Sequence, residues 1–171
     1  SYILEFFLVQ RYIKFCAYVL CMVIYIGSDH AGFDLKEAIK KHFEKEGIQY
    51  VDLGNAVKED TDDYPDFIVP VAEAVSKDEN ARGIVLGGSG QGEAIAANKI
   101  KGVRCALYYG GNTDIITLSK EHNNANVLSL GGRFLEEKEA LSAIDVWLAT
   151  DFTNEERHVR RLKKISSLGG S

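Results

Sequence analysis

The chain has 171 residues, of which 46% are hydrophobic and 26% charged, so it can bury one core without disulfides or metals. Its formal net charge of −5 and the lack of a basic stripe exclude nucleic acid as the main partner. The three cysteines are odd in number and have no metal-ligand spacing, which is typical of a protein from the reducing cytoplasm.

The first 21 residues differ in composition from the rest. They are dense in aromatic and aliphatic side chains, but Glu5, Arg11 and Lys14 interrupt them too often for a membrane span, and they lack the ordered regions of a secretory signal. Met22, the only methionine, directly precedes an apolar run. We therefore expect residues 1–21 to be a non-native extension and 22–171 to form a single domain. The alternative is an accessory strand or amphipathic helix that docks on the domain or on a partner subunit.

From Met22 onward, short β-rich runs alternate with helical runs. The predicted strands are 23–26, 49–53, 83–86, 103–108 and 126–130, and the predicted helices are 33–46, 65–77, 93–99, 113–121, 136–149 and 154–167. This alternation predicts an α/β protein with a three-layer Rossmann-like fold, in which helices flank a five-stranded parallel sheet. Such sheets bind ligands beyond the carboxyl ends of their strands.

A glycine-rich loop, Gly87-Gly88-Ser89-Gly90-Gln91-Gly92-Glu93, joins the third predicted strand to a helix. Free backbone N–H groups and the positive end of a helix dipole meet at such a turn, which suits a phosphate or a developing oxyanion. The carboxylate in the same loop indicates proton chemistry. The simpler interpretation is a structural turn, because glycine suits any tight turn.

A dinucleotide site is a further alternative for this loop. It expects Gly-x-Gly-x-x-Gly after the first strand, with an acidic residue about 20 positions later. In this chain the glycines follow the third strand and are spaced differently.

Other reactive side chains stand near the predicted strand ends. We expect them to gather at one rim of the sheet together with the glycine loop, in the segments Ser28-Asp29-His30-Ala31-Gly32, Glu121-His122-Asn123-Asn124 and Gly131-Gly132-Arg133.

These segments, together with Thr61-Asp62-Asp63-Tyr64-Pro65, Ala96-Ala97-Asn98-Lys99 and Arg157-His158-Val159-Arg160-Arg161, resemble the ribose-5-phosphate isomerase B family of the ribose/galactose isomerases. The resemblance covers Met22 to about Ser167. It implies an aldose–ketose isomerase that acts on ribose 5-phosphate through a cis-enediolate, with no metal and no cofactor. Relatives that isomerise allose 6-phosphate or galactose 6-phosphate share much of the pattern, so a hexose phosphate is an alternative substrate.

The resemblance also implies the base. One branch of the family uses a cysteine at the place of Gly87, and another carries a glutamate at the place of Glu93. This chain resembles the glutamate branch, so we expect Glu93 to move the proton between C2 and C1. Cys105, inside a predicted strand, is expected to be a small buried hydrophobe.

The other expected roles follow from the same resemblance. Ser89 and the amides of the glycine loop (Gly88, Gly90, Gln91, Gly92) would stabilise the enediolate. His122 would open the sugar ring with Asp29 as its partner, although a helix-end histidine can also be a simple cap. The expected phosphate ligands are His30, Arg157 and Arg161. Asn123 and Arg133 would contact the sugar hydroxyls or the phosphate, and Tyr64 would pack over the substrate. Arg157 and Arg161 lie four apart on a predicted helix, and the alternative for them is a solvated basic face.

The resemblance implies a homodimer or homotetramer with shared active sites and no membrane partner. We expect His122, Asn123 and Arg133 of one chain to approach Asp29 and Glu93 of the other. A non-catalytic module that senses a nucleotide or a phosphosugar is the alternative outside the enzymes, because fold does not imply function.

Overall fold

A computed structural model describes residues 22–168 of the chain. The predictions for residues 1–21 fall outside this range. The strands are β1 (Ile24–Ser28), β2 (Tyr50–Asp52), β3 (Arg82–Gly87), β4 (Cys105–Tyr108) and β5 (Val127–Gly131). The helices are α2 (Phe33–Glu46), α3 (Pro65–Ser76), α4 (Gln91–Ala97), α5 (Asp114–Glu121), α6 (Glu137–Ala149) and α7 (Glu156–Ser166).

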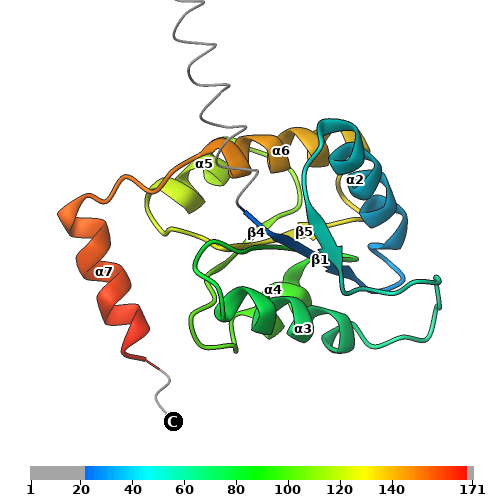
Figure 1. Cartoon of the computed structure of the whole chain (residues 1–171), viewed down its shortest axis with the longest axis horizontal. Coiled ribbons are helices and arrows are strands. Elements are labelled where there is room, and N and C mark those ends of the chain that lie inside the picture. The colour runs from blue at the N-terminus through cyan, green and yellow to red at the C-terminus, as the bar shows by residue number, and fades with distance from the viewer. Residues whose placement is uncertain (1–21, 169–171) are drawn as a thin grey trace, which may run out of the picture.

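The strands form one parallel sheet in the order β2-β1-β3-β5-β4. All six residues of the central strand β3 are buried, because helices cover both of its faces. Side chains alternate along it: Ile84 and Leu86 enter the core beside α2 and α6, whereas Val85 enters the core beside α3 and α4. Figure 1 shows these layers, with α2, α5 and α6 on one face of the sheet and α3 and α4 on the other. The α/β fold predicted from the sequence is confirmed.

The element boundaries agree closely with the prediction. Helix α2 has the predicted bounds and is capped by the following Gly47, whose φ of 70° is the left-handed conformation that glycine adopts readily. Helix α3 begins at Pro65, whose missing N–H is not needed in the first turn. Helix α4 begins two residues earlier than predicted, at Gln91, so Glu93 lies within its first turn.

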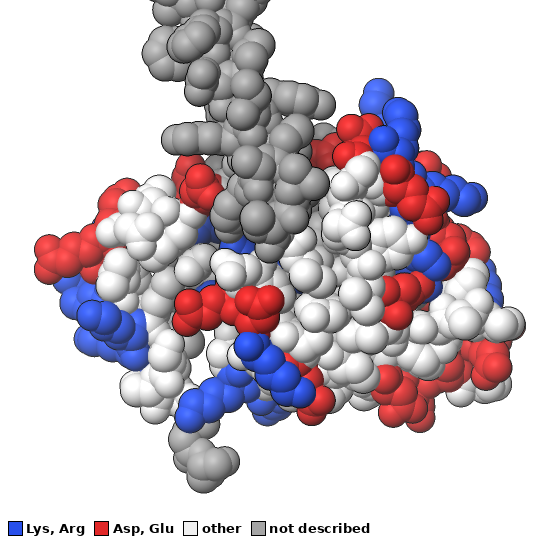
Figure 2. Space-filling view, viewed as in Figure 1, with Lys and Arg blue, Asp and Glu red and all other residues white. Residues whose placement is uncertain are grey.

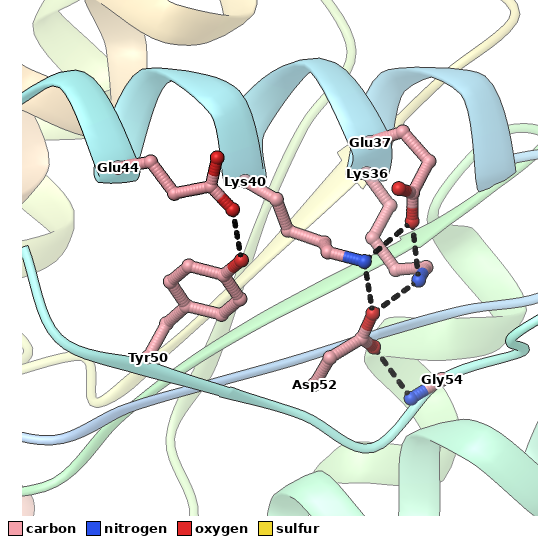
Figure 3. A network of polar contacts seen from close by, with 7 residues as sticks. All are labelled: Lys36, Glu37, Lys40, Glu44, Tyr50, Asp52 and Gly54. Carbon is pink, nitrogen blue, oxygen red and sulfur yellow. Dashed lines mark hydrogen bonds and ion pairs between the residues drawn. The ribbon is translucent and has the colours of Figure 1, made fainter.

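A buried lysine joins α2 to the edge strand β2 (Figure 3). Lys36 is fully buried, and its Nζ lies 2.5 Å from Asp52 Oδ2 and 2.9 Å from Glu37 Oε1. Lys40 Nζ reaches the same Asp52 oxygen at 2.8 Å. The other oxygen of Asp52 accepts the N–H of Gly54 at 2.9 Å. This network satisfies the buried charge and anchors the start of the long loop between β2 and α3.

Helix α7 covers neither face of the sheet and projects to one side (Figure 1). Its only buried residue is His158. Figure 2 shows Lys and Arg side chains gathered on this helix, at the left of the view. The segment just before α7 is hydrogen-bonded to the end of α5, since Thr153 donates from both N and Oγ1 to the carbonyl of Glu121. Among the described residues, no helix has the length and apolar character that a membrane span requires.

Candidate active site

The carboxyl ends of β1, β3 and β5 meet at one edge of the sheet and bring three loops together. The backbone of the segment after β5 bonds to the glycine loop after β3: Gly132 N–H donates to Gly87 O at 2.8 Å, and Arg133 N–H donates to Gly88 O at 3.0 Å. A Cβ at Gly132 would lie 3.2 Å from Ala31 O, in the loop after β1. The three loops therefore form one rigid rim.

The turn of the glycine loop depends on Gly90. Its φ is +75°, and a Cβ there would lie 2.7 Å from Leu107 Cδ1 and 3.0 Å from the carbonyl carbon of Leu130. No larger residue fits this position without moving the sheet. Ser89 Oγ accepts the N–H of Gln91 at 3.3 Å, which leaves the hydroxyl proton of Ser89 free to be donated.

Glu93 lies beneath this loop and is 4% exposed. Its carboxylate fills the space beside Gly87, where a Cβ would overlap it. Burial raises the pKa of the Glu93 carboxyl above its ordinary value, and the Asp29 charge acts in the same direction. A carboxylate with a raised pKa is better matched to proton transfer near neutral pH.

Asp29 stands directly after β1 and is 6% exposed. Its Oδ1 accepts the N–H of Ala31 at 2.9 Å and the N–H of Gly32 at 3.1 Å. These bonds hold the turn that leads into α2. The same carboxylate is near enough to Glu93 to raise the pKa of that group.

His30 pairs with Asp62, which belongs to the Thr61-Asp62-Asp63-Tyr64-Pro65 motif but was not among the predicted site residues. Asp62 Oδ1 lies 2.6 Å from His30 Nδ1 and 3.2 Å from the backbone nitrogen of His30. The hydrogen bond to Asp62 raises the pKa of His30 above its ordinary value, although burial acts against it. The acidic composition of the loop was the only sequence signal for Asp62, and it did not single out one of its carboxylates.

Asp29, His30 and Asp62 are also the one group in residues 22–168 whose ligand atoms lie close enough together to hold a metal ion, all within 4.8 Å. The hydrogen bonds of these three side chains account for their proximity without an ion. We therefore assign no metal site to them.

Tyr64 and Arg133 flank the glycine loop on two sides. A Cβ at Gly92 would lie 2.8 Å from Tyr64 Cζ, and a Cβ at Gly88 would lie 3.4 Å from Arg133 Nη1. Both glycines therefore allow a large side chain to approach the loop closely. Among the expected site residues, this edge brings together Asp29, His30, Tyr64, Gly88, Ser89, Gly90, Gln91, Gly92, Glu93 and Arg133.

His122 and Asn123 are not at this edge, which corrects the expectation that they share the rim. Helix α5 returns the chain from the carboxyl end of β4 to the amino end of β5, so its last residues lie at the opposite edge of the sheet. A backbone hydrogen bond confirms that the end of α5 lies at the amino edge of the sheet, because Asn126 N–H donates to Arg104 O, just before β4. The five-residue strand β5 spans about 13 Å, which separates His122 from the glycine loop of its own chain.

His122 instead meets helix α7. Its ring stacks on His158 with 4.2 Å between centroids and 13° between planes. His158 is 2% exposed, and within residues 22–168 its buried Nε2 has no hydrogen-bond partner. Burial lowers the pKa of His158, and His122 acts in the same direction. A neutral His158 allows the two rings to stack without charge repulsion.

Arg157 and Arg161 lie on α7 and are exposed, with Arg157 Nε 2.8 Å from Glu155 Oε2. They belong with His122 and Asn123 at the far side of the molecule. One chain thus carries two separate groups of expected site residues. Arg133 belongs to the group at the carboxyl edge, so the expected grouping of Arg133 with His122 and Asn123 is corrected.

Residues 24–165 match the family described as Ribose/Galactose Isomerase. The chain belongs to this family. It is 45% identical over 141 residues to ribose-5-phosphate isomerase B of Mycolicibacterium paratuberculosis, over 82% of this chain and 87% of that protein. The solved structure of ribose-5-phosphate isomerase B from Mycoplasma genitalium, with bound ribulose-5-phosphate, has a TM-score of 0.81 and 39% identity, over 85% of this chain and 95% of that chain. The enzyme of the same name from Clostridium thermocellum has a TM-score of 0.81 and 43% identity, over 86% of this chain and 97% of that chain.

The contact between Gly87 and Glu93 agrees with the expected resemblance of this ribose/galactose isomerase to the glutamate branch. A side chain at position 87 and the Glu93 carboxylate would occupy the same space. Cys105 does not compete for the role of base, since burial raises the pKa of its thiol to about 12 and keeps it protonated at neutral pH.

Proposed function

We propose that this protein is a ribose-5-phosphate isomerase that interconverts ribose 5-phosphate and ribulose 5-phosphate, with Glu93 as the base. The observation that carries the proposal is the buried Glu93 carboxylate beside Gly87, with a raised pKa, at the start of a helix and under a loop of backbone amides. The names of the relatives support ribose 5-phosphate as the substrate, and none of the contacts in the site favours a hexose phosphate over it.

In the proposed reaction, Glu93 removes the proton from C2 of the open-chain aldose. The C2–H electron pair forms the C1–C2 double bond of a cis-enediolate, and the carbonyl electrons move onto O1. The proton then returns from Glu93 to C1, and a proton passes from O2 to O1, so that the carbonyl group stands at C2. One carboxylate serves both steps because it holds the proton only between them.

The glycine loop would stabilise the enediolate. Its amides lie at the first turn of α4, where the helix dipole favours negative charge. Ser89 keeps a hydroxyl proton to donate. Donors that the fold holds in place before the charge develops contribute most to such catalysis.

Ring opening by His122 and phosphate binding by Arg157 and Arg161 need a second subunit in this proposal. These residues lie at the opposite edge from Glu93 in one chain, so a complete site requires them from a partner. The proposed homodimer, alone or paired into a tetramer, would join the glycine-loop edge of one chain to α5 and α7 of the other. Asp29 and Tyr64 would then face the sugar from the first chain, and Asn123 from the second.

The surface of the chain supports such an assembly. A groove of about 650 Å³ beside the edge strand β4 is lined partly by Ile95 and Tyr109, which are 65% and 49% exposed. Helix α7 has an apolar stripe of Val159, Leu162 and Ile165 opposite its charged side, and His158 is its one buried residue. Both features are expected to be covered by a second copy. We place the protein in the cytoplasm, where its odd number of cysteines would stay reduced.

A turnover assay of the purified protein tests the proposal. Ribose 5-phosphate, allose 6-phosphate and galactose 6-phosphate are compared by kcat/KM, with Glu93→Gln as the control for contaminating activity. We expect the pentose phosphate to be the best of the three substrates. Binding of ribose 5-phosphate without turnover would favour a sensor, and a higher kcat/KM with either hexose phosphate would reassign the substrate.

A further inference from the structure

Asp62 contacts both the backbone and the side chain of His30, although the two residues are 32 positions apart in the sequence. One oxygen of Asp62 accepts from the backbone N–H of His30 at 3.2 Å and lies 2.6 Å from Nδ1 of the same residue. Its other oxygen accepts from the side-chain amide of Asn55. The Asp62 side chain is only 6% exposed, whereas that of His30 is 25% exposed.

The contact determines which nitrogen of His30 carries a proton. A carboxylate can only accept, so Nδ1 must be the donor in this pair. Nε2 is then the ring nitrogen that remains available to a ligand. The backbone of His30 is held from both sides as well, because its carbonyl accepts the N–H of Phe33 at the start of α2. The ring is therefore oriented before any ligand arrives.

We infer that Asp62 is a positioning residue, which holds the His30 imidazole in the orientation and charge state in which Nε2 donates a hydrogen bond to the substrate phosphate. This inference rests on the proposed function, which gives His30 a phosphate to bind. A charged donor in a fixed orientation binds a phosphate dianion more strongly than a neutral, mobile ring does.

Three carboxylates near His30 all raise the pKa of its ring. Asp62 is in direct contact, Asp29 directly precedes His30, and Asp60 lies in the same loop as Asp62; all three favour the protonated ring. Only Asp62 touches the ring. The buried network of Lys36, Asp52 and Gly54 anchors the start of the loop that carries Asp62 (Figure 3). The loop that carries Asp62 is thus attached to α2 at its start.

The test compares Asp62→Asn with Asp60→Asn, which removes the same charge from the same loop without touching His30. We expect Asp62→Asn to lower the His30 pKa, measured by NMR, because the hydrogen bond to Asp62 is the largest cause that raises it. The KM for ribose 5-phosphate should then be about tenfold above that of the parent at pH 8 and close to it at pH 5.5, where His30 is protonated in both proteins. The kcat should be unchanged, and Asp60→Asn should change the His30 pKa and the KM much less than Asp62→Asn does, because the charge of Asp60 is the smallest of the causes that raise this pKa. A KM ratio that is constant with pH, with an unchanged His30 titration, would overturn the inference.

Two further measurements separate this inference from the proposed function. The first is the tautomer of neutral His30 in the parent protein, read from its ring ¹⁵N shifts; we expect the Nδ1–H form, and a dominant Nε2–H form would contradict the role of Asp62 even if the variant does not fold. The second is the binding of inorganic phosphate, which should weaken in Asp62→Asn at pH 8. A parent protein without turnover would refute the proposed function, and the inference would then stand or fall on the tautomer and on phosphate binding.

Discussion

The Glu93 carboxylate occupies the space that a side chain at Gly87 would need. The two residues lie at the end of β3 and in the first turn of α4, and the tight turn between them folds the helix back over the strand. The carboxylate is buried there, which raises the pKa of Glu93. The glycine is thus part of the proposed catalytic arrangement although it has no side chain.

Replacing the base should abolish turnover. Glu93→Gln keeps the shape but cannot accept the C2 proton, so we expect kcat to fall about 10³-fold with little change in KM for ribose 5-phosphate. Steady-state kinetics measure both. Cys105→Ala is the control and should change kcat and KM only slightly, because the thiol is protonated at neutral pH. Near-normal turnover in Glu93→Gln would show that Glu93 is not the base.

A methyl group at position 87 should lower kcat almost as much as the loss of the Glu93 carboxylate does. Gly87→Ala would force the Glu93 carboxylate out of its space, so we expect kcat to fall at least 10²-fold while ribose 5-phosphate still binds. The matched control is Gly47→Ala, where a Cβ meets nothing within 4 Å and only the positive φ is strained. Full activity in Gly87→Ala would show that the position of the carboxylate is not critical.

The arginines of α7 should matter for the phosphate. Arg157→Ala and Arg161→Ala should each raise KM for ribose 5-phosphate roughly tenfold to a hundredfold, the effect expected for a lost charged hydrogen bond. Arg160→Ala, on the same helix and equally exposed, is the control and should leave KM unchanged. Equal affinity of the parent for ribose and ribose 5-phosphate would rule out a phosphate site.

Two inactive variants should restore activity when they are mixed. Glu93 and His122 lie at opposite edges of one chain, so in a shared site each pocket takes one of them from each subunit. A heterodimer of Glu93→Gln and His122→Ala would have one doubly altered pocket and one intact pocket. After subunit exchange at equal mixing, activity should recover to about a quarter of the parent level, because half of the dimers are mixed.

The mixing experiment requires proof that subunits exchange, for example by native mass spectrometry of a tagged and an untagged chain. With exchange shown, a mixture that stays inactive would mean that each site is built within one chain.

Lys120 should make stability depend on pH. It is 4% exposed, its Nζ donates to Ala125 O at 3.2 Å, and it lies 5.0 Å from the centre of the Trp147 ring. Burial lowers the pKa of Lys120 to about 7, and the charges of Arg82 and Arg104 act in the same direction. The unfolded chain keeps an ordinary lysine pKa of about 10.4, so it binds more protons than the folded protein between pH 7 and 10.4. The buried Lys120 amine therefore lowers the free energy of unfolding most below pH 7. This effect becomes smaller as the pH rises.

Lys120→Met should accordingly stabilise the protein by about 1–3 kcal/mol at pH 6, with a smaller gain at pH 9.5. Urea unfolding at the two pH values measures the difference, and the exposed Lys138→Met serves as the control. A destabilised Lys120→Met would mean that the hydrogen bond to Ala125 contributes more than the burial of the amine costs.

Local patterns in the sequence predicted the order and type of the elements and the place of the glycine loop. Helix α2 was predicted with its bounds because its period and its terminal Gly47 are local signals. The rim formed by the Asp29 and Glu93 segments followed from the rule that ligands bind at the carboxyl ends of parallel strands.

Which of the expected residues lie close together depends on how the elements pack in three dimensions. His122 precedes a strand in the chain, and the return of α5 to the amino edge separates it from Glu93. The pairing of His30 with Asp62 joins residues 32 positions apart, and a sequence pattern carries no distance between such residues. The overlap at Gly87 likewise depends on the angle at which α4 leaves β3. Local propensity and periodicity specify single elements, whereas contacts between elements follow from how the two cores pack on the sheet.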